Sequence, residues 1–104
     1  MAIFNGVAYL AGQVANDLSQ DIIGQMREVL NIIDALLAQA NSDKSRILTA
    51  QIYIADLADY AGMNVVWDAW LADIKGSAPP RATVQAKLAN ANYRVEVVIT
   101  AAQK

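Results

Sequence analysis

The chain contains neither cysteine nor histidine among its 104 residues. Their absence excludes disulfide bonds, thiolate nucleophiles, imidazole bases and the usual zinc ligands. No glycine-rich phosphate loop or dinucleotide fingerprint is present either, so we expect no cofactor and no metal. Any chemistry must therefore use carboxylates, arginine, lysine, tyrosine, backbone groups and water.

Basic residues are few: eight Lys and Arg stand against ten Asp and Glu, and the net charge is −2. Because no basic run occurs, nucleic acid is an unexpected partner. The apolar N-terminal segment has no basic start, and no stretch approaches the ~20 apolar residues that cross a bilayer. We therefore expect a cytoplasmic protein without a membrane partner.

Charged residues make up only 17% of the chain and hydrophobic residues 56%, against about 25% and about 45–50% in average soluble domains. We expect residues 1–104 to form one domain, because so short a chain cannot close a second core. A small domain has much surface per residue and should be more polar than average. The apolar excess reflects either many alanines or an interface between subunits, and we favour the interface.

The pattern of apolar residues predicts the order strand, helix, strand, helix, strand, strand. The predicted elements are a strand over 6–14, a helix capped by Asp17 or Ser19 and ending near Asn41, a strand over 45–56, a helix after the cap Asp56, and a hairpin of strands 82–88 and 93–101. This order favours an α/β two-layer fold, a mixed β-sheet with both helices packed on one face.

Alternation along the strands predicts what the other face of the sheet carries. The expected residues there are Thr49, Gln51, Thr83, Gln85 and Val98. This face is too weakly charged to be well solvated, so we expect it to line the interior of an oligomer. Trp67 and Trp70 continue the apolar stripe of the second helix, and we interpret them as structural residues.

Two polar residues are candidates for chemistry. Arg81 follows Pro79 and Pro80, where a stiff backbone can aim a guanidinium at a carboxylate, although it could also be a surface or interface cation. In the predicted hairpin Glu96 lies opposite Gln85, four residues from Arg81 and thus on the order of 13 Å away. If both belong to one site, at least one comes from a neighbouring subunit, unless a β-bulge shifts the register of the hairpin.

Three segments, AYLAGQV, DIIGQMREVLNIIDALLAQANSDKSRILTAQIYIADLADYAGMNVVWDAW and PPRATVQAKLANANYRVEVVITAA, resemble the RidA/YjgF family in order and spacing. The resemblance implies a chorismate-mutase-like fold and a homotrimer with clefts between subunits. It also implies hydrolysis of 2-imino or enamine acids to 2-keto acids and ammonia. In that activity Arg81 would bind the substrate carboxylate, and Glu96 would help to place the hydrolytic water.

The resemblance extends to residues that border the family's cleft. Gly12 and Asn64 match such positions, although Asn64 could instead form a structural hydrogen bond between helix and strand. Ala11 stands where the family usually has serine, and Thr83 where it often has cysteine. We expect no counterpart of a tyrosine that deaminating members carry in an N-terminal segment.

Two other functions remain open. A non-catalytic module could use the same Arg81 cleft to sense a keto acid or an amino acid. RNA cleavage, proposed for some relatives, is disfavoured by the acidic composition and by the absence of histidine. For imine hydrolysis and for sensing alike, the expected partner is a small molecule that bears a carboxylate.

Overall fold

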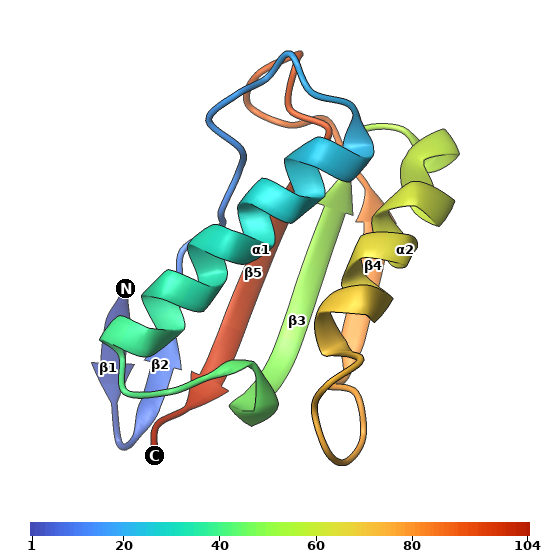
Figure 1. Cartoon of the computed structure of the whole chain (residues 1–104). Coiled ribbons are helices and arrows are strands. Elements are labelled where there is room, and N and C mark those ends of the chain that lie inside the picture. The colour runs from blue at the N-terminus through green and yellow to red at the C-terminus, as the bar shows by residue number, and fades with distance from the viewer.

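The computed structural model describes all 104 residues as one mixed sheet with two helices on one of its faces (Figure 1). The elements are β1 (Ala2–Phe4), β2 (Val7–Tyr9), α1 (Ile22–Gln39), β3 (Ile47–Ile54), α2 (Tyr60–Leu71), β4 (Arg81–Gln85) and β5 (Val95–Ala102). The strand order is β1-β2-β5-β3-β4, with β3 and β4 parallel and the other pairs antiparallel. The predicted two-layer α/β fold is confirmed.

The first predicted strand is divided in the structure. Asn5 and Gly6, with φ of 50° and 76°, turn the chain between β1 and β2. Positive φ at both positions is the signature of the type I′ hairpin turn, which favours Asn-Gly. Beyond Tyr9 only Gln13 pairs again, in an isolated bridge to Val97. The single strand over 6–14 was therefore wrong in extent.

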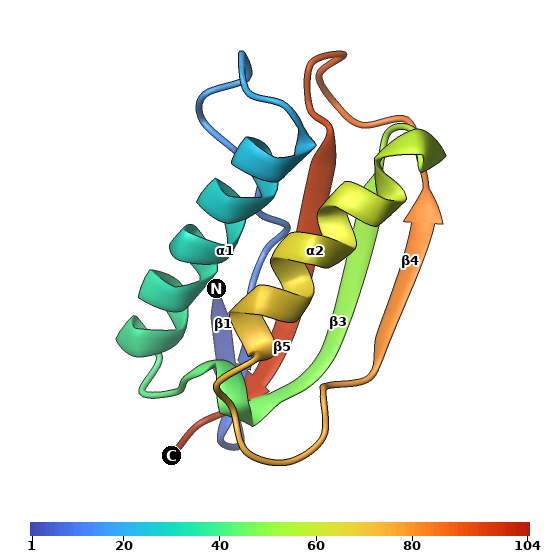
Figure 2. The same cartoon turned by 45° about the vertical axis from the view of Figure 1, so that its right-hand side comes forward.

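The predicted hairpin between the last two strands is also wrong, because β3 lies between β4 and β5. Tyr53 of β3 pairs with Glu96 on one side and with Val84 on the other. Helix α2 connects the parallel strands β3 and β4. Such a crossover helix brings the chain back across the sheet, so that β4 lies next to β3. Figure 2 shows β4 as the free edge of the sheet, beside α2.

One face of the sheet is covered by the helices. Its core residues alternate along β3 and β5, with Ala50, Ile52, Ile54, Val95, Val97 and Ile99 at most 1% exposed. Thr83 is in register with Ile52 and Gln85 with Ile54, so both face the helices. Their predicted place on the other face was therefore wrong, because β4 pairs with β3 and not with β5.

The other face, here called the open face, has no helix over it. It carries Tyr9, Thr49, Gln51, Tyr53, Ala82, Val84, Glu96, Val98 and Thr100. Thr49, Gln51 and Val98 were correctly predicted there. A register shift between Ile47 and Thr49 buries Ile47 and leaves Leu48 46% exposed, which reverses the alternation expected at the start of β3.

The helices begin near the predicted caps. The side chain of Asp21, and not of Asp17 or Ser19, caps α1 by accepting a hydrogen bond from the Gly24 amide at 2.9 Å. Asp56 caps a short 3-10 turn that leads into α2. Trp67 is 3% exposed and Trp70 packs at the margin of the core, as expected of structural residues. Neither helix has the length and apolarity that a bilayer crossing requires.

Candidate functional site

Arg81 is held against helix α2. It is the first residue of the edge strand β4, and its Nη2 donates a hydrogen bond to Tyr60 Oη at 3.3 Å. Its Cζ lies 5.9 Å from the ring centroid of Tyr60 and 5.6 Å from that of Trp67. Because Tyr60 and Trp67 are two turns apart on one side of α2, they hold the guanidinium from two directions.

No carboxylate neutralises Arg81. The three ion pairs of the chain join Lys44 to Asp73, Arg94 to Asp59 and Lys104 to Asp43. Aromatic faces and a phenol attract a cation without cancelling its charge. Arg81 therefore presents a planar cationic fork that has no carboxylate partner in the chain and contacts α2, an arrangement that suits the binding of a carboxylate.

Two of the other predicted residues lie near Arg81. Thr83, two residues along the same face of β4, has a buried Oγ1 without any hydrogen-bond partner. The side chain of Asn64, four residues from Tyr60 on α2, and then the positive charge of Arg81 lower the pKa of the Tyr60 phenol below its usual range.

Glu96 belongs to a second cluster, on the open face. Its carboxylate makes no hydrogen bond or ion pair within the chain, and it lies over Gly12. A methyl group on Gly12 would come within 2.8 Å of Glu96 Cδ and 3.1 Å of its Cγ, so glycine leaves the space that this side chain fills. The neighbouring Ala11 is exposed, and its carbonyl accepts a hydrogen bond from Gln13 Nε2 at 2.9 Å.

The two clusters lie on opposite faces of the sheet. Arg81 is in register with Ala50 under the helices, whereas Glu96 is in register with Tyr53 on the open face. The structure therefore brings together Arg81, Thr83 and Asn64, and separately Gly12, Ala11 and Glu96. The hairpin register from which we inferred their separation was wrong, but one chain does keep Arg81 and Glu96 apart.

The sequence analysis missed Tyr60 and Trp67 as neighbours of Arg81, because both fit the apolar stripe of α2. Tyr60, Asn64 and Trp67 are spaced by four and three residues, which puts them on one side of a helix. A tyrosine and an amide at that spacing would have indicated a polar patch. That the patch meets Arg81 depends on the parallel pairing of β4 with β3, which local patterns do not reveal.

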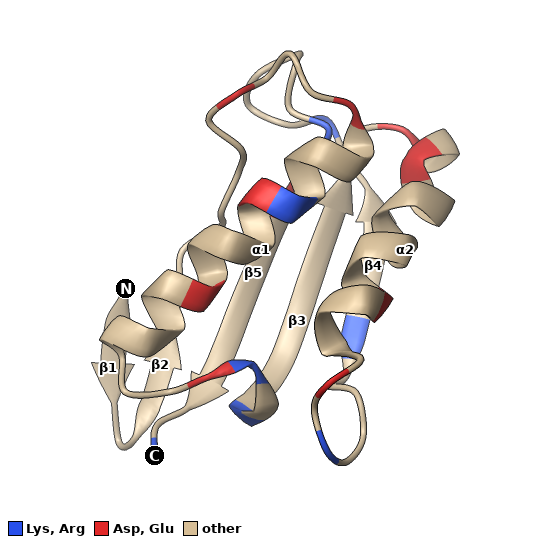
Figure 3. Ribbon diagram, viewed as in Figure 1, with Lys and Arg blue, Asp and Glu red and all other residues tan.

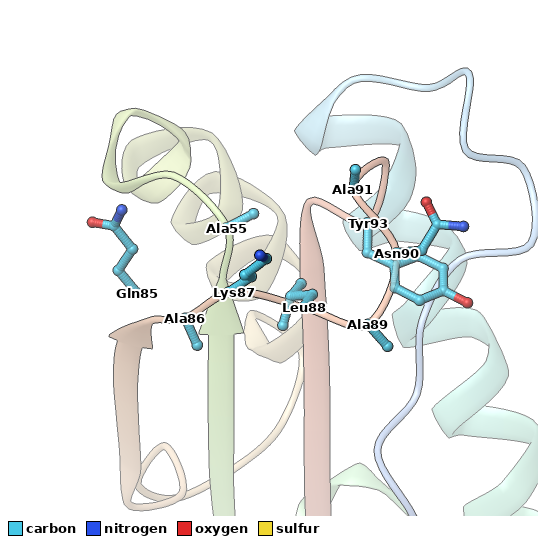
Figure 4. Close-up of a pocket in the computed structure, with 9 residues that line it drawn as sticks. All are labelled: Ala55, Gln85, Ala86, Lys87, Leu88, Ala89, Asn90, Ala91 and Tyr93. Atoms are coloured by element: carbon cyan, nitrogen blue, oxygen red, sulfur yellow. The ribbon is translucent and has the colours of Figure 1, made fainter.

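The surface hollows of the chain lie elsewhere. The largest, of about 700 Å³, is covered by the loop after β4 (Figure 4) and is lined by Ala55, Gln85, Ala86, Lys87, Leu88, Ala89, Asn90, Ala91 and Tyr93. A second, of about 320 Å³, lies between the helices and includes Arg27. Neither contains Arg81 or Glu96. No group of acidic side chains is arranged to hold a metal ion.

The candidate polar groups of this two-layer α/β domain therefore lie at a free sheet edge, with Arg81, and on an uncovered sheet face, with Glu96. The profile of the family described as Endoribonuclease L-PSP matches residues 1–103. The chain belongs to this family, whose members are also called RutC, YjgF or Rid proteins.

Individual relatives agree with this assignment. A RutC family protein from Haemophilus ducreyi is 55% identical over 98% of this chain and 86% of its own length. The RutC family protein YoaB from Escherichia coli is 45% identical over 98% of this chain and 87% of its own. A crystal structure of a YjgF family member from Neisseria meningitidis, 44% identical, superimposes with a TM-score of 0.90 over 96% of this chain and 82% of that one.

Proposed function

We propose that the protein hydrolyses 2-imino or enamine acids to 2-keto acids and ammonia, in clefts between the subunits of a homotrimer. The observation that carries this proposal is Arg81, a cation without a carboxylate partner that α2 holds in one position. Thr83 adds a buried hydroxyl without a partner beside it. Together they offer a carboxylate site with a polar group for the neighbouring atom of the ligand.

The placement of the site between subunits is supported by the separation of the two clusters. Arg81 faces the helices at the sheet edge, and Glu96 is on the open face, so one site with both residues needs two copies. The open face is suited to burial, because its strands carry little charge and β3 carries none (Figure 3). Its residues Tyr9 and Val84 are 47% and 43% exposed in the single chain.

The proposed mechanism gives each residue a role. Arg81 holds the substrate carboxylate with two parallel hydrogen bonds. Thr83 of the same subunit and backbone groups near Gly12 of an adjoining subunit orient the C=N bond. A water molecule placed by Glu96 of an adjoining subunit attacks the carbon of that bond. Because free imines hydrolyse unaided, orientation and a fixed water are sufficient for acceleration. Such chemistry needs neither histidine nor cysteine.

The proposal is tested with imines made in place by an amino-acid oxidase, with semicarbazide competing for them. We expect the protein to speed keto-acid formation and to reduce the semicarbazone yield. Arg27→Ala is the matched control for Arg81→Ala. Like Arg81, Arg27 is an arginine without an ion pair, but it lies in the groove between the helices. An unchanged semicarbazone yield, with imines from small and bulky amino acids alike, would contradict the proposal.

A sensing module is the second candidate. It is favoured by Glu96, whose carboxylate no hydrogen bond fixes within the chain, and by Ala11, which offers no hydroxyl. Melting shifts with a 2-keto acid, without any effect on the semicarbazone yield, would support it. The family is described as an endoribonuclease, which makes RNA cleavage a third candidate function. A net charge of −2 disfavours the binding of RNA. RNA incubated with nuclease-free protein should stay intact.

A further inference from the structure

Tyr60 accepts a hydrogen bond from the side chain of Arg81, and the proposed function gives it no role. It is the first residue of α2 and is 42% exposed. Its oxygen lies 3.3 Å from Arg81 Nη2 and its ring 5.9 Å from Arg81 Cζ. A carboxylate on the guanidinium would therefore bring the next atoms of the ligand close to the phenol oxygen.

The hydroxyl of Tyr60 accepts one hydrogen bond within the chain and donates none. A phenol oxygen accepts up to two hydrogen bonds and donates one. The structure shows one donor to it, the guanidinium of Arg81 at 3.3 Å. No group of the chain accepts the Tyr60 hydrogen, so it is available to a ligand. Asn64, then the charge of Arg81, lower the pKa of this phenol, and both would stabilise a phenolate if the proton were given up.

We propose that the Tyr60 hydroxyl donates its hydrogen to the atom at position 2 of the ligand, the imine nitrogen of a substrate or the keto oxygen of a product. This inference rests on the proposed function, since Arg81 must hold the carboxylate. With both parallel bonds of the Arg81 fork used by the carboxylate, the adjacent C=N or C=O is the remaining acceptor in reach of Tyr60.

The proposed proton transfers balance. When water adds to the carbon, the π electron pair moves to nitrogen, which takes the Tyr60 proton, and Glu96 takes a proton from the water. The result is a carbinolamine, a tyrosinate beside Arg81 and a neutral Glu96. As the C–N bond breaks, the hydroxyl proton returns to Tyr60, the Glu96 proton goes to the leaving nitrogen, and a keto acid and ammonia remain.

Two ligands that differ only at position 2 test the inference, with Tyr60→Phe as the variant. Phenylalanine keeps the ring against Arg81 and removes the hydroxyl alone. Calorimetric titration should show 2-oxobutanoate binding about fivefold to tenfold more weakly to the variant, which is the loss of one neutral hydrogen bond. Butanoate, which has no acceptor at position 2, should change less than twofold. Tyr93→Phe, which removes a phenol that lines the large hollow, should change neither affinity.

Each other outcome has a distinct meaning. If Tyr60→Phe lowered the affinity for both ligands equally, the inference would be overturned, because Tyr60 would then act on the carboxylate or through Arg81. Unchanged binding of both would overturn it as well and make Tyr60 structural. If the unmodified protein binds neither ligand, the Arg81 carboxylate site fails, and with it the proposed function. In the imine assay, Tyr60→Phe should lower kcat more than it changes KM.

Discussion

The Arg81 cluster and the Glu96 cluster differ in how much of each the chain itself holds in place. Arg81 has a hydrogen bond to Tyr60 and two aromatic rings within 6 Å, on a helix that is anchored in the core through Trp67. Glu96 has no polar partner, and its fit depends on an empty space above Gly12.

The difference indicates how a site could be assembled from two copies. The Arg81 cluster is organised within the single chain, and under the proposed function this would let it bind a carboxylate at little entropic cost. The Glu96 cluster lies on the open face, where alternate residues of β5 remain half-exposed while their neighbours are fully buried. What fixes Glu96 must come from a ligand, water or another subunit. Four predicted effects, taken from the largest to the smallest, test this comparison.

The largest effect is expected from a charge on the open face. Val98 lies there in register with Gln51, and Val98→Asp would bury an unpaired carboxylate in the proposed assembly, at a cost of several kcal/mol. Light scattering should show about three times 11.2 kDa for the unmodified chain and dissociation or unfolding for the variant. Val65→Asp, at a position of α2 that is 63% exposed, is the control. A stable monomer of the unmodified chain at micromolar concentration would refute the trimer.

The next effect concerns the helix that holds Arg81. Trp67 is 3% exposed, and Trp67→Ala should cost roughly 3–5 kcal/mol of folding free energy, measured by denaturant unfolding. Trp70→Ala should cost less, because that indole is partly exposed and bonds to Asp34 at 3.0 Å near the surface. A Trp67 variant that stayed stable and lost only ligand binding would show that the indole serves the ligand and not the core.

The sequence predicts the layers of this fold better than its connections. Helical spacing located α1 and α2, and strand alternation located the buried positions of β5, because both depend on local patterns of burial. The neighbour of β4 could not be read in the same way. The loop after Gln85 is compatible with a hairpin, and only the packing of α2 as a crossover places β3 between β4 and β5.

The candidate site was predicted residue by residue, but not in its arrangement. Arg81 and Glu96 were candidates from their positions on the predicted strands, and the resemblance added Gly12 and Thr83. The division of these residues between two faces follows from the register of β3 with both neighbours. Tyr60 also fits the helical spacing of the apolar stripe of α2, so the sequence does not distinguish this partly exposed tyrosine from a core residue. Side-chain contacts across elements carry no signal in a single sequence.

The third effect concerns the geometry of the Arg81 fork. Arg81→Lys keeps the charge but replaces a planar fork with a compact ammonium, so a carboxylate held by two parallel bonds loses one. At roughly 1.5–3 kcal/mol for a charge-assisted bond, kcat/KM should fall by about one to two orders of magnitude. Arg81→Ala should be at least as damaging, and both variants should fold and assemble. Near-normal imine hydrolysis by an intact alanine variant would contradict the assignment of Arg81.

The smallest effect, and the most specific to the Glu96 cluster, is expected from Gly12→Ala. The new methyl group would occupy the space of the Glu96 carboxylate. Since φ at Gly12 is not positive, alanine brings no backbone strain, and the long Glu96 side chain can turn away. We therefore expect little loss of stability, but about a tenfold fall in kcat/KM, because a displaced carboxylate no longer places the water.

A double-mutant cycle decides whether Gly12→Ala acts through Glu96. Glu96→Ala removes the atoms that the new methyl group would meet, so adding Gly12→Ala to that variant should change kcat/KM no further. Independent effects of the two substitutions would multiply instead, and the double variant would lose about a further tenfold. That outcome would mean that Gly12 contributes its own backbone to the ligand, and that the open space above it is incidental to the position of Glu96.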